Sequence, residues 1–346
     1  MFGQHRWMLG VATSTSILGL TMTSGLVFLA NRLVDEFSHP HEIVSMEEFQ
    51  LPLPSIVPEP PRTSQRPLTF ETSDGTLLCG DFWAQPQLAP TIVMCHGYRA
   101  SRAQLRHGAA IQYSMGYNVL LFDFRGHGDS DSIITSGGNA EVRDLEAAIT
   151  VARLQPETLP HSIIIHGFSM GAAIALLTPP QPGVAAIIAD SPFARSDEIL
   201  VRLVNYRLTA KNLSFAHLRY LHSLSPALAW TLVTTSKLVF RARFGYTFVA
   251  RPESIFKRWV KKARREPERK HIPILLIHAV GDELIPISHA NTLVARAKAN
   301  GVPIETYFVD HSTHCGAFIH NPEQYTAVIQ QFLACHMQGN IPPLSA

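Results

Sequence analysis

The sequence predicts an α/β protein with a mainly parallel sheet of eight strands and helices on both faces. Short apolar runs alternate with helical patterns along most of the 346 residues. Such alternation is typical of parallel sheets buried on both sides. Apolar residues make up 46% of the chain, enough for a large core. One apolar run also ends in a sharp glycine-containing turn that leads directly into a helical pattern.

Each strand is predicted from a short apolar run bounded by turn residues. These runs cover residues 68–72, 76–83, 91–95, 118–122, 162–165, 184–189, 273–278 and 304–309. Helical patterns cover residues 101–115, 139–154 and 322–337, and another follows residue 169. Asp74-Gly75 marks a hairpin turn between the first two strands. Functional groups are expected where the parallel strands end at their carboxyl edge.

The alternation divides the chain into a core and an insertion. The core is predicted over residues 68–192 and 271–340, because the strand runs stop between them. Residues 193–270 keep helical patterns without a strand and are predicted to form a helical cap. Residues 31–67 hold seven prolines, which predicts an extended linker.

The N-terminal region predicts a membrane anchor. After a tail at residues 1–6, residues 7–30 carry no charge over 24 positions, long enough to span a bilayer as a helix. Seven threonines and serines dilute the run, and a cleaved signal peptide or a buried helix are the alternatives. We expect a single-pass membrane protein. Its flanking charges are level and leave the side of the catalytic domain open, with a weak preference for an N-terminus inside.

The charge is distributed unevenly. The net charge is only +2, but residues 195–270 hold 17 Lys/Arg against 5 Asp/Glu, with the densest run at 257–265. This run is either a solvated helix face or part of a cap that contacts anionic lipid headgroups. No nucleic-acid-binding motif accompanies it, so a nucleic-acid partner is not expected. The four cysteines have neither metal-ligand nor disulfide spacing, and no metal site is predicted.

Ser169 is the candidate nucleophile. It lies in a Gly-x-Ser-x-Gly motif between Gly167 and Gly171, after an apolar strand and before a helix. This context defines a nucleophile elbow, in which a strained turn lifts the serine hydroxyl above the sheet. Side chains at the two glycine positions would collide across the turn.

Two further residues complete a candidate triad. Asp282 follows one apolar strand, and His314 follows the last strand, which gives the order serine, aspartate, histidine. His314 would accept the proton of Ser169 and return it to the leaving group, while Asp282 orients the ring. Water would then hydrolyse the acyl-enzyme. His311 is the alternative base, and Asp190, also at a strand end, is the alternative acid.

Two backbone N–H groups are predicted to stabilise the oxyanion that forms in this reaction. One belongs to Met170, at the start of the helix after the nucleophile. The other is assigned to Tyr98, in the glycine-containing turn after the strand at 91–95.

Four ordered motifs resemble the serine α/β-hydrolase superfamily, in its monoacylglycerol-lipase-like and serine-aminopeptidase-like branch with membrane-anchored members. They begin at His96-Gly-Tyr-Arg, Phe122-Asp-Phe-Arg-Gly-His-Gly, Gly167-Phe-Ser-Met-Gly and Ala189-Asp-Ser-Pro. The resemblance covers about residues 68–337 and implies the α/β-hydrolase fold, acyl hydrolysis and no metal or organic cofactor. It favours His314 as the base, because the Cys-Gly-Ala-Phe that follows resembles the family's segment there. It also implies that Asp190 is structural.

Three functions remain open from the sequence. The preferred hypothesis is a serine hydrolase of carboxylic esters, with lipid or lysolipid esters among the substrates. The alternative is a serine peptidase of the same fold, because one triad serves both reactions. The third is a non-catalytic interaction protein on a hydrolase scaffold. The cap is longer and more basic than a short family cap, so the substrate cannot be taken from the resemblance.

Overall fold

A computed structural model of the chain describes residues 23–40, 59–209, 224–265 and 272–337. These residues divide into two compact units. The helical unit comprises Met1–Ser38 and Leu200–Phe248, and the sheet unit comprises His39–Ile199 and Val249–Ala346. The sheet unit holds the sheet and the candidate triad, and the helical unit holds the middle of the predicted cap.

The sheet has eight strands in the order β1-β2-β4-β3-β5-β6-β7-β8. The strands are β1 (Gln65–Glu71), β2 (Leu77–Trp83), β3 (Ala89–Cys95), β4 (Asn118–Phe122), β5 (Thr158–Phe168), β6 (Val184–Asp190), β7 (Ile274–Ala279) and β8 (Ile304–Val309). β2 pairs antiparallel with β1 and β4, and the other neighbours are parallel. The predicted α/β-hydrolase fold with a mainly parallel eight-stranded sheet is confirmed.

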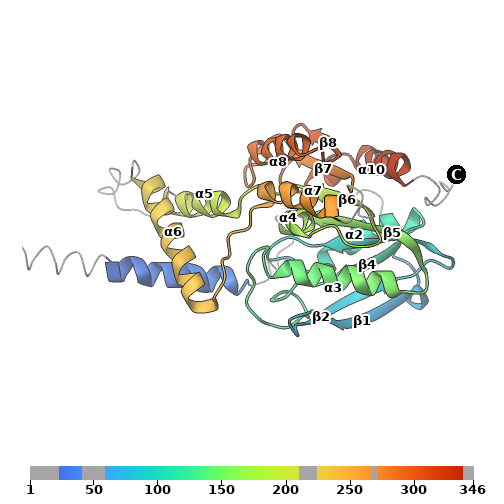
Figure 1. The fold of residues 1–346 in the computed structure, drawn as a ribbon, viewed down its shortest axis with the longest axis horizontal. Coiled ribbons are helices and arrows are strands. Elements are labelled where there is room, and N and C mark those ends of the chain that lie inside the picture. The colour runs from blue at the N-terminus through green and yellow to red at the C-terminus, as the bar shows by residue number, and fades with distance from the viewer. Residues whose placement is uncertain (1–22, 41–58, 210–223, 266–271, 338–346) are drawn as a thin grey trace, which may run out of the picture. The chain divides into compact units, whose positions relative to one another are not determined.

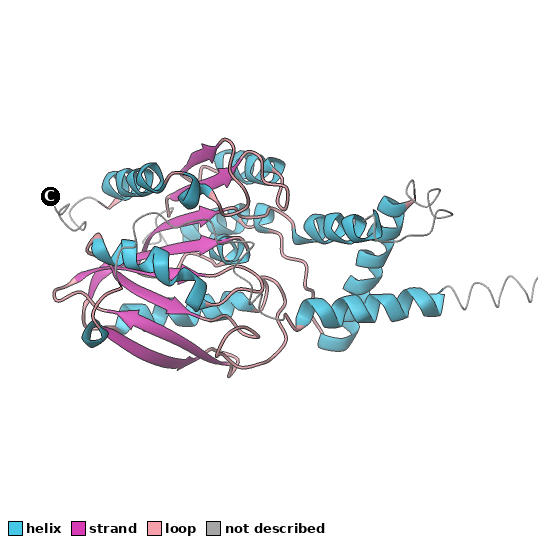
Figure 2. Cartoon of the chain, turned by 180° about the vertical axis from the view of Figure 1, so that it is seen from behind, coloured by secondary structure: helices cyan, strands magenta, loops and turns pink. Residues whose placement is uncertain are grey.

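Helices cover both faces of this sheet (Figure 2). Side chains of α3, α4, α7 and α8 join one core cluster, and those of α2 and α10 join the other. The helices of the sheet unit are α2 (Arg102–Ser114), α3 (Glu141–Leu154), α4 (Met170–Leu177), α7 (Phe256–Arg265), α8 (Ile287–Ala299), α9 (Ala317–His320) and α10 (Pro322–His336), with short 3₁₀ turns η2 (Arg62–Ser64) and η4 (Pro252–Ser254). Because β3, β4 and β7 are buried along their whole length, their sequences are nearly continuous apolar runs.

The helical unit consists of three helices among its described residues: residues 23–38, most of α5 (Ser196–Thr209) and α6 (Ser225–Phe244). Its core is small, with Val204, Ala229 and Val233 buried together. Two ion pairs join the helices: Arg243 to Asp35 and Arg207 to Glu36, both at 2.7 Å.

The predicted cap at 193–270 is not one body. Residues 249–265 pack with the sheet unit, because α7 buries Phe256 and Trp259 in its core. These two residues are three apart and share one helix face, while Lys257 and Lys261 are exposed on the other. The basic run at 257–265 therefore belongs to an amphipathic helix of the sheet unit, and α5 and α6 supply the cap-like helices.

The predicted N-terminal anchor falls partly outside the described residues. The tail at 1–6 and residues 7–22 of the anchor lie there, as do residues 41–58 of the predicted linker. Residues 23–30 are helical as predicted, but the helix continues to residue 38, where the linker was expected. Packing of Ala30 and Val34 explains the longer helix, since both are buried. Within the described ranges, no helix combines the length and the apolar character needed to cross a membrane.

A buried charge cluster fixes the loop after β4 against the β1–β2 turn and α3. The Arg125 guanidinium donates to Asp144 of α3, with Nη2 to Oδ1 at 2.6 Å, and to Asp74 of the turn, with Nη1 to Oδ2 at 2.9 Å. Arg125 and Asp144 are both buried, and Arg143 contacts Asp74 only at the surface, at 3.4 Å.

Replacing Arg125 with methionine is expected to destabilise the protein by about 3–5 kcal/mol, because it leaves the Asp144 carboxylate buried without its cation. The matched variant Arg143→Met removes an exposed partner of the same cluster and is expected to cost about 1 kcal/mol or less. Urea unfolding of the two variants measures the difference. Equal midpoints would show that the buried pair adds nothing beyond a surface contact.

Candidate active site

Ser169 lies at the end of β5, in the strained turn that the motif predicts. Its φ is +51°, in the left-handed region that non-glycine residues rarely adopt. A Cβ at position 167 would lie 2.5 Å from the Gly171 carbonyl oxygen, and one at 171 would lie 2.3 Å from the Cys95 carbonyl oxygen. Only glycine fits either position, and α4 begins directly after the serine.

The three residues of the candidate triad form one hydrogen-bonded chain. His314 Nε2 lies 2.9 Å from Ser169 Oγ, and His314 Nδ1 lies 2.6 Å from Asp282 Oδ2. Asp282 is ionised in such a chain, so Nδ1 carries the ring proton and Nε2 accepts from the serine hydroxyl. The three residues follow β7, β8 and β5 at their carboxyl ends, where parallel sheets hold functional groups.

The Asp282 carboxylate is held in place by backbone donors. Its Oδ1 accepts the N–H of Leu284 at 2.9 Å and that of Ile285 at 2.8 Å. Its Oδ2 is thereby directed at His314. His278 closes the turn from below, with Nε2 donating to the Ile285 carbonyl at 2.8 Å. The orientation of the His314 ring is therefore built into the turn after β7.

The pKa of His314 is raised well above its usual value. Burial opposes the imidazolium, but contact with Cys315 and the hydrogen-bonded Asp282 carboxylate outweigh it. A positive charge that forms on His314 during proton transfer is thus stabilised in this site.

The two alternative residues lie elsewhere. His311 is exposed and makes no side-chain hydrogen bond within the described part of the chain. Asp190 is fully buried and accepts hydrogen bonds from Ser191 Oγ and the Tyr325 hydroxyl, both at 2.9 Å. Burial raises the pKa of Asp190 to about 6.

The turn after β3 lies against Ser169. A Cβ built on Gly97 would lie 3.4 Å from Ser169 Cβ, so a larger residue would crowd the nucleophile. His96 fixes this turn: its Nε2 accepts the Phe124 N–H at 3.0 Å, and its Nδ1 donates to the Gly97 carbonyl at 2.7 Å. Burial lowers the pKa of His96 to about 3, so the ring stays neutral. Tyr98 and Met170 follow Gly97 and Ser169 directly, and their N–H groups remain the predicted oxyanion donors.

A second hydrogen-bonded chain, missed from the sequence, supports the loop of His314. The Cys315 N–H donates to Ser191 Oγ at 3.1 Å, and Ser191 donates to Asp190, which also accepts from Tyr325. His166 lies 3.1 Å from the Tyr325 hydroxyl. Ser191 and Cys315 both have positive φ values, +53° each. The Asp190-Ser191 pair at a strand end was the only sequence signal, because Tyr325 is 135 residues away.

Fold and site together define an α/β-hydrolase with a serine, histidine and aspartate in line. The family model of the serine aminopeptidases, S33 (Hydrolase_4), matches residues 86–315, more than half of the chain. The chain belongs to this family. No group of three His, Cys, Asp or Glu side chains suited to a metal ion occurs among the described residues.

Several known proteins are similar to the chain. YqkD of Bacillus subtilis, a protein described as uncharacterized, is 29% identical over 248 residues, which is 70% of each chain. The Pyrococcus furiosus esterase Pf2001 superposes with a TM-score of 0.61 at 21% identity, covering 87% of this chain and 99% of the esterase. The Pyrococcus horikoshii acylaminoacyl peptidase superposes with a TM-score of 0.51 at 18% identity, covering 81% of this chain and 43% of the peptidase. At these identities the two structures show the shared fold.

Proposed function

We propose that the protein is a serine hydrolase that cleaves carboxylic esters, lipid or lysolipid esters among them, through an acyl-enzyme intermediate. The observation that carries the proposal is the 2.9 Å contact between His314 Nε2 and Ser169 Oγ, with Asp282 on the far nitrogen of the ring. In this proposal Ser169 is the nucleophile, His314 the general base and acid, and Asp282 the residue that orients and stabilises the imidazolium.

The proposed reaction has two halves. Ser169 Oγ attacks the ester carbonyl carbon while its proton moves to His314 Nε2, and the oxyanion is stabilised by the N–H groups of Tyr98 and Met170. His314 then gives this proton to the departing alkoxide, which leaves as the alcohol. A water molecule repeats the attack on the acyl-enzyme, its proton passing through His314 back to Ser169 as the acid is released.

A serine peptidase is the second candidate. The family description and the acylaminoacyl peptidase with the same fold favour it, whereas esterase Pf2001 favours esters. The third hypothesis, a non-catalytic scaffold, requires Ser169 beyond hydrogen-bond reach of its base. The 2.9 Å separation speaks against it.

The proposal includes attachment to a membrane. Its support is the sequence between residues 7 and 30, which is free of charge and leads into helix 23–38. A single N-terminal anchor would hold the sheet unit near lipid substrates through the proline-rich segment.

The purified full-length protein is expected to hydrolyse p-nitrophenyl esters faster than aminoacyl p-nitroanilides. The comparison uses esters of increasing acyl length and reports kcat/KM for each. Prior treatment with a fluorophosphonate should abolish both activities, because both would use Ser169. A dominant anilide rate would make the peptidase the better assignment. The absence of both turnover and fluorophosphonate labelling would favour the non-catalytic scaffold.

A further inference from the structure

Exposed apolar side chains are concentrated in the helical unit. Ten of the 17 large apolar side chains exposed in the described part of the chain belong to it, although it is the smaller unit. Val27, Phe28 and Leu29 are three consecutive examples on helix 23–38, and Phe28 is 64% exposed. A cluster of this kind on a soluble protein marks an interaction surface.

Helix α6 is apolar on two opposite faces. Ala229, Val233 and Phe240 are buried on the inner face. Leu228 and Leu238 project from the opposite side, 49% and 68% exposed. The whole outer face follows helical spacing and carries no charge: Leu224, Ala227, Leu228, Thr231, Thr235 and Leu238. A helix that is apolar all round is normally enclosed by protein or lipid.

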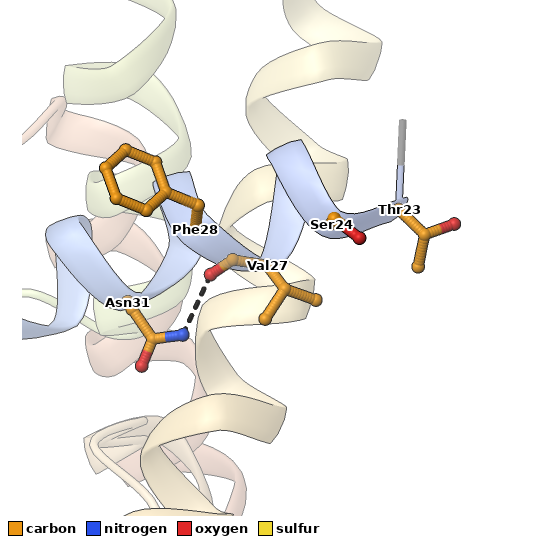
Figure 3. Close-up of a pocket in the computed structure, with 5 residues that line it drawn as sticks. All are labelled: Thr23, Ser24, Val27, Phe28 and Asn31. Atoms are coloured by element: carbon orange, nitrogen blue, oxygen red, sulfur yellow. Dashed lines mark hydrogen bonds between the residues drawn. The ribbon is translucent and has the colours of Figure 1, made fainter. Parts of the chain in front are cut away.

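The polar groups on these apolar surfaces are satisfied within their own helices. Thr231 Oγ1 donates to the Ala227 carbonyl at 2.8 Å, and Thr235 Oγ1 donates to the Thr231 carbonyl at 2.9 Å. On helix 23–38, Asn31 Nδ2 donates to the Val27 carbonyl at 2.9 Å (Figure 3). Both residues line an open pocket of about 460 Å³ along that helix. Such side chains need no partner from water, a condition for entering a lipid interface.

The charges of the unit favour an anionic surface. Its described residues hold six basic and two acidic side chains, and both acidic ones are engaged by arginines. Lys237 and Arg241 lie on α6 one residue before and three residues after Leu238. Apolar and aromatic side chains bordered by basic ones are typical of helices that lie in a membrane interface.

We propose that the helical unit docks on an anionic lipid bilayer, with the outer face of α6 and the exposed start of helix 23–38 at the acyl–headgroup boundary. The inference deepens the proposed membrane attachment by naming a second contact surface. A bilayer fits better than a protein partner, because the uncharged run at 7–22 leads directly into this unit and the surface offers no unsatisfied hydrogen-bonding groups of its own on α6.

Trp230, 61% exposed on α6, reports the contact directly. In the full-length variant Trp7→Phe, the two remaining tryptophans, Trp83 and Trp259, are buried. With phosphatidylglycerol vesicles, the Trp230 emission is expected to shift to the blue and to be quenched by bromine-labelled acyl chains. Adding Trp230→Phe should remove the quenched component. Vesicle-bound protein whose Trp230 stays unquenched, or the absence of vesicle binding, would overturn the proposal.

A second variant tests the leucines. Leu224→Gln with Leu228→Gln and Leu238→Gln is expected to weaken partition into phosphatidylglycerol vesicles by at least about tenfold. The matched control replaces three exposed leucines of the sheet unit, Leu77, Leu88 and Leu154, by glutamine and should leave partition unchanged. Both triple variants should keep the turnover of a soluble short-chain ester, which separates this test from that of the proposed function. Equal partition of the two variants, or a dimer that only the α6 variant dissociates without a change in partition, would contradict docking on lipid.

Discussion

Ser169→Ala is expected to lower ester turnover by about 10⁶-fold, the loss that follows removal of a triad nucleophile. No other atom can take the place of Oγ, because it alone lies 2.9 Å from the base and at the end of the strained turn. The residual rate would come from the oxyanion donors and substrate binding. The assay is kcat for the best ester of the acyl series, with fluorophosphonate labelling of the same samples.

The control for this experiment is Ser288→Ala, an exposed serine in α8 that is absent from the candidate site. It should retain both turnover and labelling. Alanine at position 169 keeps the backbone and loses only one hydroxyl, so the unfolding midpoint should stay close to that of the native chain. Labelling that persists in Ser169→Ala would identify a different nucleophile and would contradict the proposed triad.

His314→Ala is expected to lower turnover about as much as Ser169→Ala, because members of a triad act as a unit. His311→Ala provides the matched control, three residues earlier on the same loop, and should leave turnover unchanged. Asp282→Asn should cost about 10⁴-fold, since the amide holds the ring in the wrong tautomer. A large loss with His311→Ala and none with His314→Ala would reverse the assignment of the base.

The dependence of kcat/KM on pH tests the electrostatics of the same residue. His314 acts as a base only when neutral, so activity should rise with pH as the imidazolium loses its proton. Because the pKa of His314 is raised, this rise should be centred above the ordinary histidine value of about 6.5. Asp282→Asn removes the carboxylate that favours the cation and should move the residual profile to lower pH. A profile centred well below 6.5 in the native enzyme would contradict the paired geometry.

The eight strands and the order of the candidate triad could be predicted because both depend on local patterns. The strand predicted at 118–122 coincides with β4, since a parallel strand buried on both faces is simply an apolar run. The elbow at Ser169 could be predicted for the same reason, because glycine spacing and the flanking strand and helix are all within a few residues. Likewise, Asp282 and His314 each follow a strand directly.

The rest depends on contacts between distant residues. No local pattern pairs Tyr325 with Asp190, or Ser191 with Cys315, because the sheet and α10 bring them together only in the folded chain. The boundary of the cap was missed for a similar reason. The basic residues of α7 dominate its sequence, whereas two aromatic residues, Phe256 and Trp259, decide which unit it packs against.

The helical unit also has a consequence for the order of synthesis. Its two parts are far apart in the chain: Arg243 pairs with Asp35 across 208 residues. A ribosome adds about 5–20 residues per second, so helix 23–38 is made about 10–40 s before its partner on α6. During that interval its buried positions, Ala30 and Val34, have no α6 to pack against. The first helix to be synthesised is therefore among the last to find its place, and any factor that recognises apolar nascent chain has that interval in which to bind it.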